Sequence, residues 1–173
     1  SLSSEDTMSG NLVFTGSERD PETIKTIKRL GFNQPEIVDE TIRGWHHGRY
    51  KAMRNARARE LLTEILPILL KSISRAPKPD NTFLKFDKFL SCLPSGVQLF
   101  SMFYSNPSLL KLVAEIIGGA PRLAEYLSRQ PQVLEIVLTA GFFDKLPKKQ
   151  QMKLELNRLL KSSFSLEDVI ITT

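Results

Sequence analysis

The densest group of side chains capable of chemistry lies between residues 43 and 60. Six positive side chains and a single carboxylate, that of Glu60, fall in this stretch, which also holds the adjacent pair His46 and His47. Basic groups gathered on one face of a helix could bind phosphates, and imidazoles could ligate a metal ion. The spacing of the residues decides between these roles and a purely structural one.

The two histidines lack the spacing of a metal site. Adjacent residues of a helix point about 100° apart, whereas two ligands on one helix face stand three or four positions apart. The sequence has no third histidine, and its single cysteine, Cys92, is distant. We therefore predict no metal ligands and interpret His46 and His47 as surface or hinge residues.

Five of the basic residues fall within a helix that the sequence predicts over residues 49–75. On a helical wheel they surround this helix instead of sharing the one face that a phosphate backbone would contact. Trp45 and Tyr50 could stack on bases or pack in a core, so an independent basic module that binds nucleic acid stays the alternative function. We favour contacts with carboxylates of a neighbouring domain or partner for the five residues Arg49, Lys51, Arg54, Arg57 and Arg59.

No catalytic or cofactor-binding residue is predicted in this chain. The sequence GGAP at residues 118–121 lacks the lysine of a Walker loop, and no G-x-G-x-x-G pattern occurs. Nucleotidyl transfer with paired metal ions would need carboxylates one residue apart behind a turn of small residues. The closest spacing is found at Glu18, Asp20 and Glu22, where acidic groups already have a role in capping a helix start. We predict that the chain alone is inactive.

Helix signals recur along the chain and predict an all-α fold. Asp20 before Pro21 is typical of a capped helix start, and Gly31 is typical of a helix end. The long helix over residues 49–75 carries one apolar stripe and contains Pro67, which predicts a kink within a single element. We expect an irregular helical bundle with one long kinked helix, and we leave open whether it divides into two helical subregions.

The clearest break in the chain is the sequence RAPKPD at residues 75–80, because two prolines and a capping aspartate do not continue a helix. We expect Asp80 to open the next helix. We divide the chain into an extended or flexible leader (1–19), a helical linker region (20–75), a bundle of short helices (80–140) and loosely packed C-terminal helices (141–173). The break lies between the second and third regions. In the last region, residues 145–161 form a basic amphipathic stretch, and Ser165 begins a final short helix.

The composition favours a cytoplasmic protein. The net charge is +5, and it is concentrated in residues 43–60 and 145–161. The longest apolar run, residues 65–70, is far shorter than the roughly 20 residues that cross a bilayer. The first residues lack the basic and apolar regions of a secretory signal, and a lone cysteine forms no internal disulfide. We expect a piece of a longer cytoplasmic protein with no membrane partner.

Several long phrases of the sequence resemble a known family. RARELL, LPSGVQLFS, NPSLL and APRLAEYLSRQP occur in that order, and the similarity extends over about Asn11 to Leu138. These phrases resemble the middle of the bacterial glutamine synthetase adenylyltransferases, which are bifunctional adenylylating and adenylyl-removing enzymes. After Gly141 the resemblance is weak.

The resemblance implies a parent enzyme with two homologous nucleotidyltransferase halves. One half removes AMP from a tyrosine of glutamine synthetase, and the other attaches AMP from ATP with magnesium, under the control of PII signal proteins and glutamine. Each half carries an Asp-x-Asp pair after a Gly-Ser or Gly-Gly turn, which this sequence lacks. The expected function is therefore a non-catalytic segment that joins and orients the flanking halves, with ATP and magnesium bound elsewhere in the parent.

Overall fold

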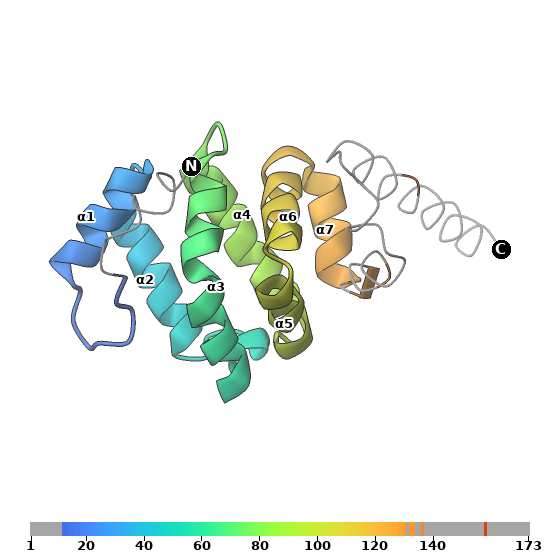
Figure 1. Ribbon diagram of the computed structural model, residues 1–173, viewed down its shortest axis with the longest axis horizontal. Coiled ribbons are helices and arrows are strands. Elements are labelled where there is room, and N and C mark those ends of the chain that lie inside the picture. Colours follow the sequence, from blue (N-terminus) through green and yellow to red (C-terminus); the bar gives the residue numbers. More distant parts are fainter. Residues whose placement is uncertain (1–11, 131, 134–135, 137–157, 159–173) are drawn as a thin grey trace.

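The computed structural model describes residues 12–130, 132, 133, 136 and 158, and the described part of the chain is all-α. Figure 1 shows the helices in a row, with α1 and α2 at one end and α7 at the other. The predicted fold class is confirmed. The expected C-terminal helices over 141–173 lie outside the described residues except for residue 158, as does most of the 1–19 leader.

The elements follow one another with short connections. They are α1 (Pro21–Leu30), α2 (Pro35–His46), the 3₁₀ turn η2 (Lys51–Met53), α3 (Ala56–Ser74), α4 (Pro79–Cys92), α5 (Val97–Ser105), α6 (Pro107–Gly119) and α7 (Pro121–Arg129).

Proline at the first turn begins five of these helices: α1, α2, α4, α6 and α7. A first-turn N–H has no partner within its own helix, so proline loses nothing there and its fixed φ suits the helix. At α1, Asp20 accepts a hydrogen bond from the Glu22 N–H, and Gly31 ends the helix in the left-handed conformation at φ 113°. The capped start at Asp20 and the end at Gly31 were predicted from the sequence and are confirmed.

The long helix predicted over residues 49–75 begins seven residues later, at Ala56. Gly48 takes a positive φ of 77°, Tyr50 is extended, and the next three residues form only a 3₁₀ turn. Asn55 then caps α3 by accepting a hydrogen bond from the Arg57 N–H at 2.8 Å. The prediction was wrong at this end because an apolar stripe does not mark where a helix starts, whereas the glycine and the asparagine cap do.

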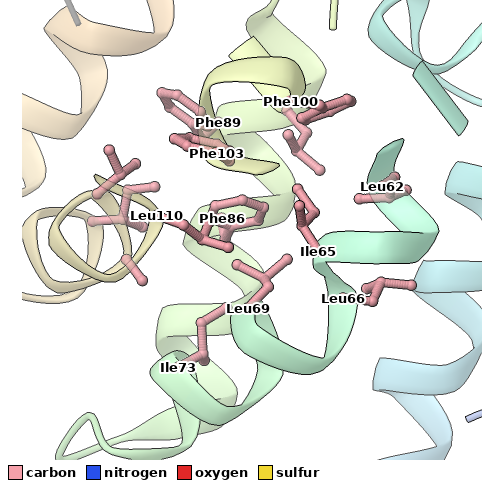
Figure 2. Close-up of a cluster of buried hydrophobic side chains, with 14 of the residues drawn as sticks. Leu62, Ile65, Leu66, Leu69, Ile73, Phe86, Phe89, Phe100, Phe103 and Leu110 are labelled. Carbon is pink, nitrogen blue, oxygen red and sulfur yellow. The ribbon is translucent and has the colours of Figure 1, made fainter. Parts of the chain in front are cut away.

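Helix α3 forms the centre of the core and continues through Pro67 as one element, as predicted. The bend expected at Pro67 stays a prediction. Ile65, Leu69 and Ile73 point from α3 toward Phe86 of α4, as Figure 2 shows, and Phe103 of α5 and Leu110 of α6 close the same group. Full burial of each such side chain contributes roughly 1.5–3 kcal/mol before entropy costs.

A single cluster of buried side chains joins the two regions that the sequence separated at residues 75–80. It runs from Phe14 to Val133 and includes residues of every helix from α1 to α7. Helix α3, from the first region, packs against α5 and α6 of the second. The break at 75–80 therefore separates two helices but not two cores. Among the described helices, none is both long enough and apolar enough to cross a membrane.

Candidate functional site

The five basic residues expected to contact a neighbour do not lie on one helix. Arg49 follows the end of α2, Lys51 begins η2, and Arg54 ends it, while Arg57 and Arg59 belong to the first turn of α3. The helical wheel that included all five was therefore wrong. They border the connection between α2 and α3, and all except the half-buried Arg59 are exposed.

Two of these arginines have partners within the chain. The Arg59 Nη1 donates to the carbonyl oxygens of Met53 and Arg54, each at 2.9 Å, and so holds η2 against the start of α3. The Arg57 Nη1 lies 3.1 Å from Glu60 Oε2 in an exposed ion pair. An exposed pair of this kind contributes at most about 1 kcal/mol, so Arg57 can exchange Glu60 for another partner at little cost.

The remaining three basic residues, Arg49, Lys51 and Arg54, are exposed. The Arg49 guanidinium stands 5.7 Å from the centre of the Tyr50 ring, and its aliphatic stem lies so close to Gly44 that a Cβ there would be 3.3 Å from Arg49 Cδ. Lys51 and Arg54 are exposed at η2. These two are the basic residues best placed to contact another domain, although that contact stays a prediction.

Of the two aromatic residues of this region, Trp45 belongs to the core and Tyr50 is half-buried at its edge. Trp45 is fully buried, its ring centre lies 5.4 Å from that of Phe83, and its Nε1 donates to Asp87 Oδ1 at 2.8 Å. Tyr50 donates its hydroxyl to Asp87 Oδ2 at 3.0 Å. Burial raises the pKa of Tyr50, and the nearby Asp87 raises it further. The buried ring of Trp45 cannot stack on bases, which weakens the argument for the nucleic-acid alternative.

Each histidine contacts its own helix. The His46 Nδ1 lies 3.0 Å from the Ile42 carbonyl oxygen, and its Nε2 lies 3.0 Å from Thr63 Oγ1 of α3. Burial lowers the pKa of His46, and the nearby charges of His47 and Arg59 act in the same direction, against the hydrogen bond to Ile42. The His47 Nδ1 lies 2.7 Å from the Arg43 carbonyl oxygen. Nowhere in the described part of the chain do three or more potential metal ligands gather.

The segment before α1 is tied down by an arginine that the sequence analysis did not single out. The Arg43 Nη1 donates to the Gly16 carbonyl at 2.7 Å, its Nη2 donates to the Glu18 carbonyl, and its Nε lies 3.0 Å from Asp39 Oδ2. Asp39 is fully buried, and its Oδ1 has no hydrogen-bond partner. The spacing of Asp39 and Arg43 on one helix face was the signal that could have identified this pair.

Closer to the N-terminus, at Val13 and Phe14, the same segment packs against α2 and α1. Phe14 is buried and stacks on the ring of His46, with 6.2 Å between the ring centres. The Val13 N–H donates to Thr23 Oγ1 at 2.9 Å, and that hydroxyl donates to Asp20 Oδ2. The described part of the 1–19 leader has no helix, and it is anchored at Val13 and Phe14.

Asp80 has a different role from the one predicted. Helix α4 begins at Pro79 after Lys78, so Asp80 does not cap it. Its two carboxylate oxygens instead accept hydrogen bonds from the backbone N–H groups of Asn33 and Gln34, each at 3.0 Å, just before α2. The carboxylate thus occupies the positive end of α2, although it comes from another helix.

A cleft of about 470 Å³ lies between the end of α3 and α6. Arg75 and Lys111 give it positive charge and Glu115 gives it negative charge, and the carbonyl ends of α3 and α6 also line it, at Ser72 and Gly118. These carbonyls favour cations, whereas the two basic side chains favour anions. The cleft therefore selects no class of ligand.

The chain is similar in sequence to several known proteins. The chain is 44% identical over 161 residues to the bifunctional glutamine synthetase adenylyltransferase/adenylyl-removing enzyme of Mesorhizobium japonicum, and 46% and 42% identical over the same length to those of Bartonella henselae and Agrobacterium fabrum. Each match covers 93% of this chain but only 16% of the relative. No protein-family model matches the chain, and no solved structure does.

Proposed function

The chain corresponds to a segment of the bifunctional glutamine synthetase adenylyltransferase/adenylyl-removing enzymes, and we propose that this segment is a non-catalytic spacer that joins and orients the two nucleotidyltransferase halves. In this proposal ATP and magnesium bind to the flanking halves. The parent acts on glutamine synthetase and responds to PII signal proteins. The proposal rests mainly on two carboxylates of α4, Asp80 and Asp87, which bind groups at the start of α2 and near its end.

The aspartates of the described residues support a structural role. Asp20 caps α1, Asp39 pairs with Arg43, Asp80 binds the backbone before α2, and Asp87 accepts from Trp45 and Tyr50. Metal-assisted transfer needs carboxylates that converge on one open point. These four are each engaged with a different part of the fold, which suits a scaffold.

The two carboxylates of α4 are seven residues apart, so their Cα atoms are about 10 Å apart along the helix. Asp80 binds the backbone at the start of α2, and Asp87 binds Trp45 near its end. A hydrogen bond to a charged group contributes about 1.5–3 kcal/mol. Sliding or rotation of α2 against α4 would break both links, so the two helices should move as one body. A spacer of this kind can hold a fixed angle between the parts it connects.

The exposed bases at η2 offer the contact with a flanking half. Lys51 and Arg54 are exposed at η2, the turn before α3 that Arg59 and Tyr50 hold in place. Because the turn is fixed, charge on these two residues can bias the position of a neighbouring domain. Carboxylates of that domain would be the matching groups.

The test is a double charge reversal, Lys51→Glu with Arg54→Glu, in the full-length parent enzyme. Arg29→Glu with Arg122→Glu provides the control, because both residues are exposed and the change in net charge is the same. We expect the first variant to change the ratio of adenylylation to adenylyl removal by at least about fivefold, within the usual range of coupling between sites. An equal ratio in wild type and both variants would rule out a role for these bases.

A further inference from the structure

Gly96, the residue before α5, is buried at a place with no room for a side chain. A Cβ added to it would lie 2.5 Å from the carbonyl oxygen of Ala52 and 2.5 Å from Cε2 of Phe100. Non-bonded heavy atoms pack at about 3.5–4.0 Å, so either contact would be a severe overlap. Ala52 belongs to η2, and the start of α5 therefore touches the turn that carries Lys51 and Arg54.

The contact, and not the backbone conformation, explains the glycine. Gly96 has φ −105° and ψ −23°, which other residues also adopt. A helix start usually has a serine, threonine, aspartate or asparagine whose side chain accepts a first-turn N–H. No side chain caps α5. The Ala52 carbonyl and the Phe100 ring occupy the space that such a side chain would need.

Two hydrogen-bonded contacts also hold η2. Arg59 of α3 donates to the carbonyl oxygens of Met53 and Arg54, and Tyr50 donates to Asp87 of α4. These bonds attract the turn to α3 and α4. The contact with the start of α5 acts differently, because it limits how closely the turn can approach. Together the three helices leave η2 one position.

We propose that Gly96 is a positioning residue for η2: the Ala52 carbonyl rests against the bare Cα of Gly96, and this contact sets where Lys51 and Arg54 stand. A shift of α5 would be passed to the two bases in the same way. That these bases contact a flanking half rests on the proposed function, whereas the positioning of η2 does not.

Gly96→Ala tests the proposal in the 173-residue chain, with Gly119→Ala as the matched control. Gly119 is an exposed residue of α6, and a Cβ there would meet nothing within 4 Å. Trypsin cleavage after Lys51 and Arg54 reports on η2, and cleavage after the exposed Lys88 of α4 reports on the rest of the fold. A displaced turn opens locally, so Gly96→Ala should raise the ratio of the two rates at least about tenfold. Gly119→Ala should leave this ratio at the wild-type value.

The titration of Tyr50 gives a second readout of the same displacement. Tyr50 precedes η2, and its pKa is raised by burial first and by Asp87 second. Moving η2 outward exposes the ring and weakens its bond to Asp87. Tyr50 should therefore titrate at a lower pH in Gly96→Ala than in wild type or Gly119→Ala. A loss of packing that left η2 in place would not change this titration.

A Phe100→Leu background separates the two overlaps that the new methyl group would make. Adding Gly96→Ala to Phe100→Leu shrinks one obstacle and keeps the overlap with the Ala52 carbonyl. Relative to Phe100→Leu alone, it should still raise the cleavage ratio at η2 at least about fivefold. The same comparison serves if Gly96→Ala alone does not fold.

Three results would each overturn the proposal: an equal cleavage ratio in Gly96→Ala and Gly119→Ala, an unchanged titration of Tyr50, or loss of the effect in the Phe100→Leu background. Gly96→Ala in the full-length parent distinguishes this inference from the proposed function. Faster cleavage at η2 with an unchanged ratio of adenylylation to adenylyl removal would support the positioning by Gly96 and count against the role of the two bases.

Discussion

The carboxylate of Asp80, in the first turn of α4, accepts the backbone N–H of Gln34 at 3.0 Å, immediately before α2 begins. Capping groups usually belong to the helix they cap, as Asp20 does at α1. Here the cap is 46 residues away in sequence. It therefore stabilises one helix and also fixes the position of a second helix relative to it.

Asp80→Ala and Asp20→Ala should cost similar amounts of stability. Each substitution removes a carboxylate that caps a helix start, and such losses amount to about 0.5–2 kcal/mol. Urea unfolding of the chain measures both. A free energy of unfolding for Asp80→Ala equal to that of wild type would show that the bonds to Asn33 and Gln34 contribute nothing.

Asp87→Asn should lower the pKa of Tyr50. Burial is the larger cause of the raised pKa and persists in the variant, but the negative charge of Asp87 is removed. A tyrosine whose pKa is raised by folding contributes stability at pH values below its pKa in the unfolded chain. This stability is lost as the pH rises through its pKa in the folded chain. The loss begins at the unfolded pKa, which is unchanged, so Asp87→Asn should lose less stability than wild type as the pH rises above it.

Tyrosinate absorbance during an alkaline titration follows this group, and Tyr50→Phe identifies its signal among the three tyrosines. An unchanged titration of Tyr50 in Asp87→Asn would contradict the hydrogen bond between the two residues.

His46 should make the chain less stable in mild acid. Burial is the largest of the effects that lower the pKa of His46 from 6.5, so the folded state favours the neutral ring. The resulting stability is present above the unfolded pKa and is lost as pH falls through the folded one. Between pH 7.5 and 5.5, the free energy of unfolding of wild type should fall more than that of His46→Gln. Parallel pH profiles would show that His46 is not responsible.

Arg43→Gln should release the segment before α1 and strand a buried charge. It removes the closer partner of Asp39, leaving only Arg19 Nε at 4.0 Å, and it removes the donors to Gly16 and Glu18. Breaking a buried pair by removing one partner typically costs about 3–5 kcal/mol. Unfolding experiments measure the loss, and limited proteolysis should detect earlier cleavage near residue 16.

Asp39→Asn combined with Arg43→Gln is the control for this charge effect. The double variant leaves no unpaired buried carboxylate, so it should recover part of the stability. If Arg43→Gln alone matched wild type in stability and cleavage, the anchoring of the segment by Arg43 would be wrong.

Local signals gave most of the helices in advance. Pro21 was identified as a helix start and Gly31 as a helix end, because each acts through its own backbone conformation. The error at the start of α3 was also local. Gly48 and Asn55 carried the needed information, but the apolar stripe was given more weight.

The long-range contacts could not be predicted from the sequence. Asp87 lies 42 residues from Trp45 and 37 from Tyr50, so nothing in the local pattern links them. Without that contact, both rings stayed open to a role in stacking on bases. The sequence was expected to place all five basic residues on one helix, but only Arg57 and Arg59 lie on α3.

The most direct test of the orienting role compares Asp80→Ala with Asp20→Ala in the full-length parent enzyme. Both remove a helix cap, but only Asp80 links two helices. The measurement is the ratio of adenylylation to adenylyl removal on glutamine synthetase. We predict a change of at least about fivefold for Asp80→Ala and none for Asp20→Ala. An equal ratio in wild type and both variants would contradict the claim that this segment orients the two halves.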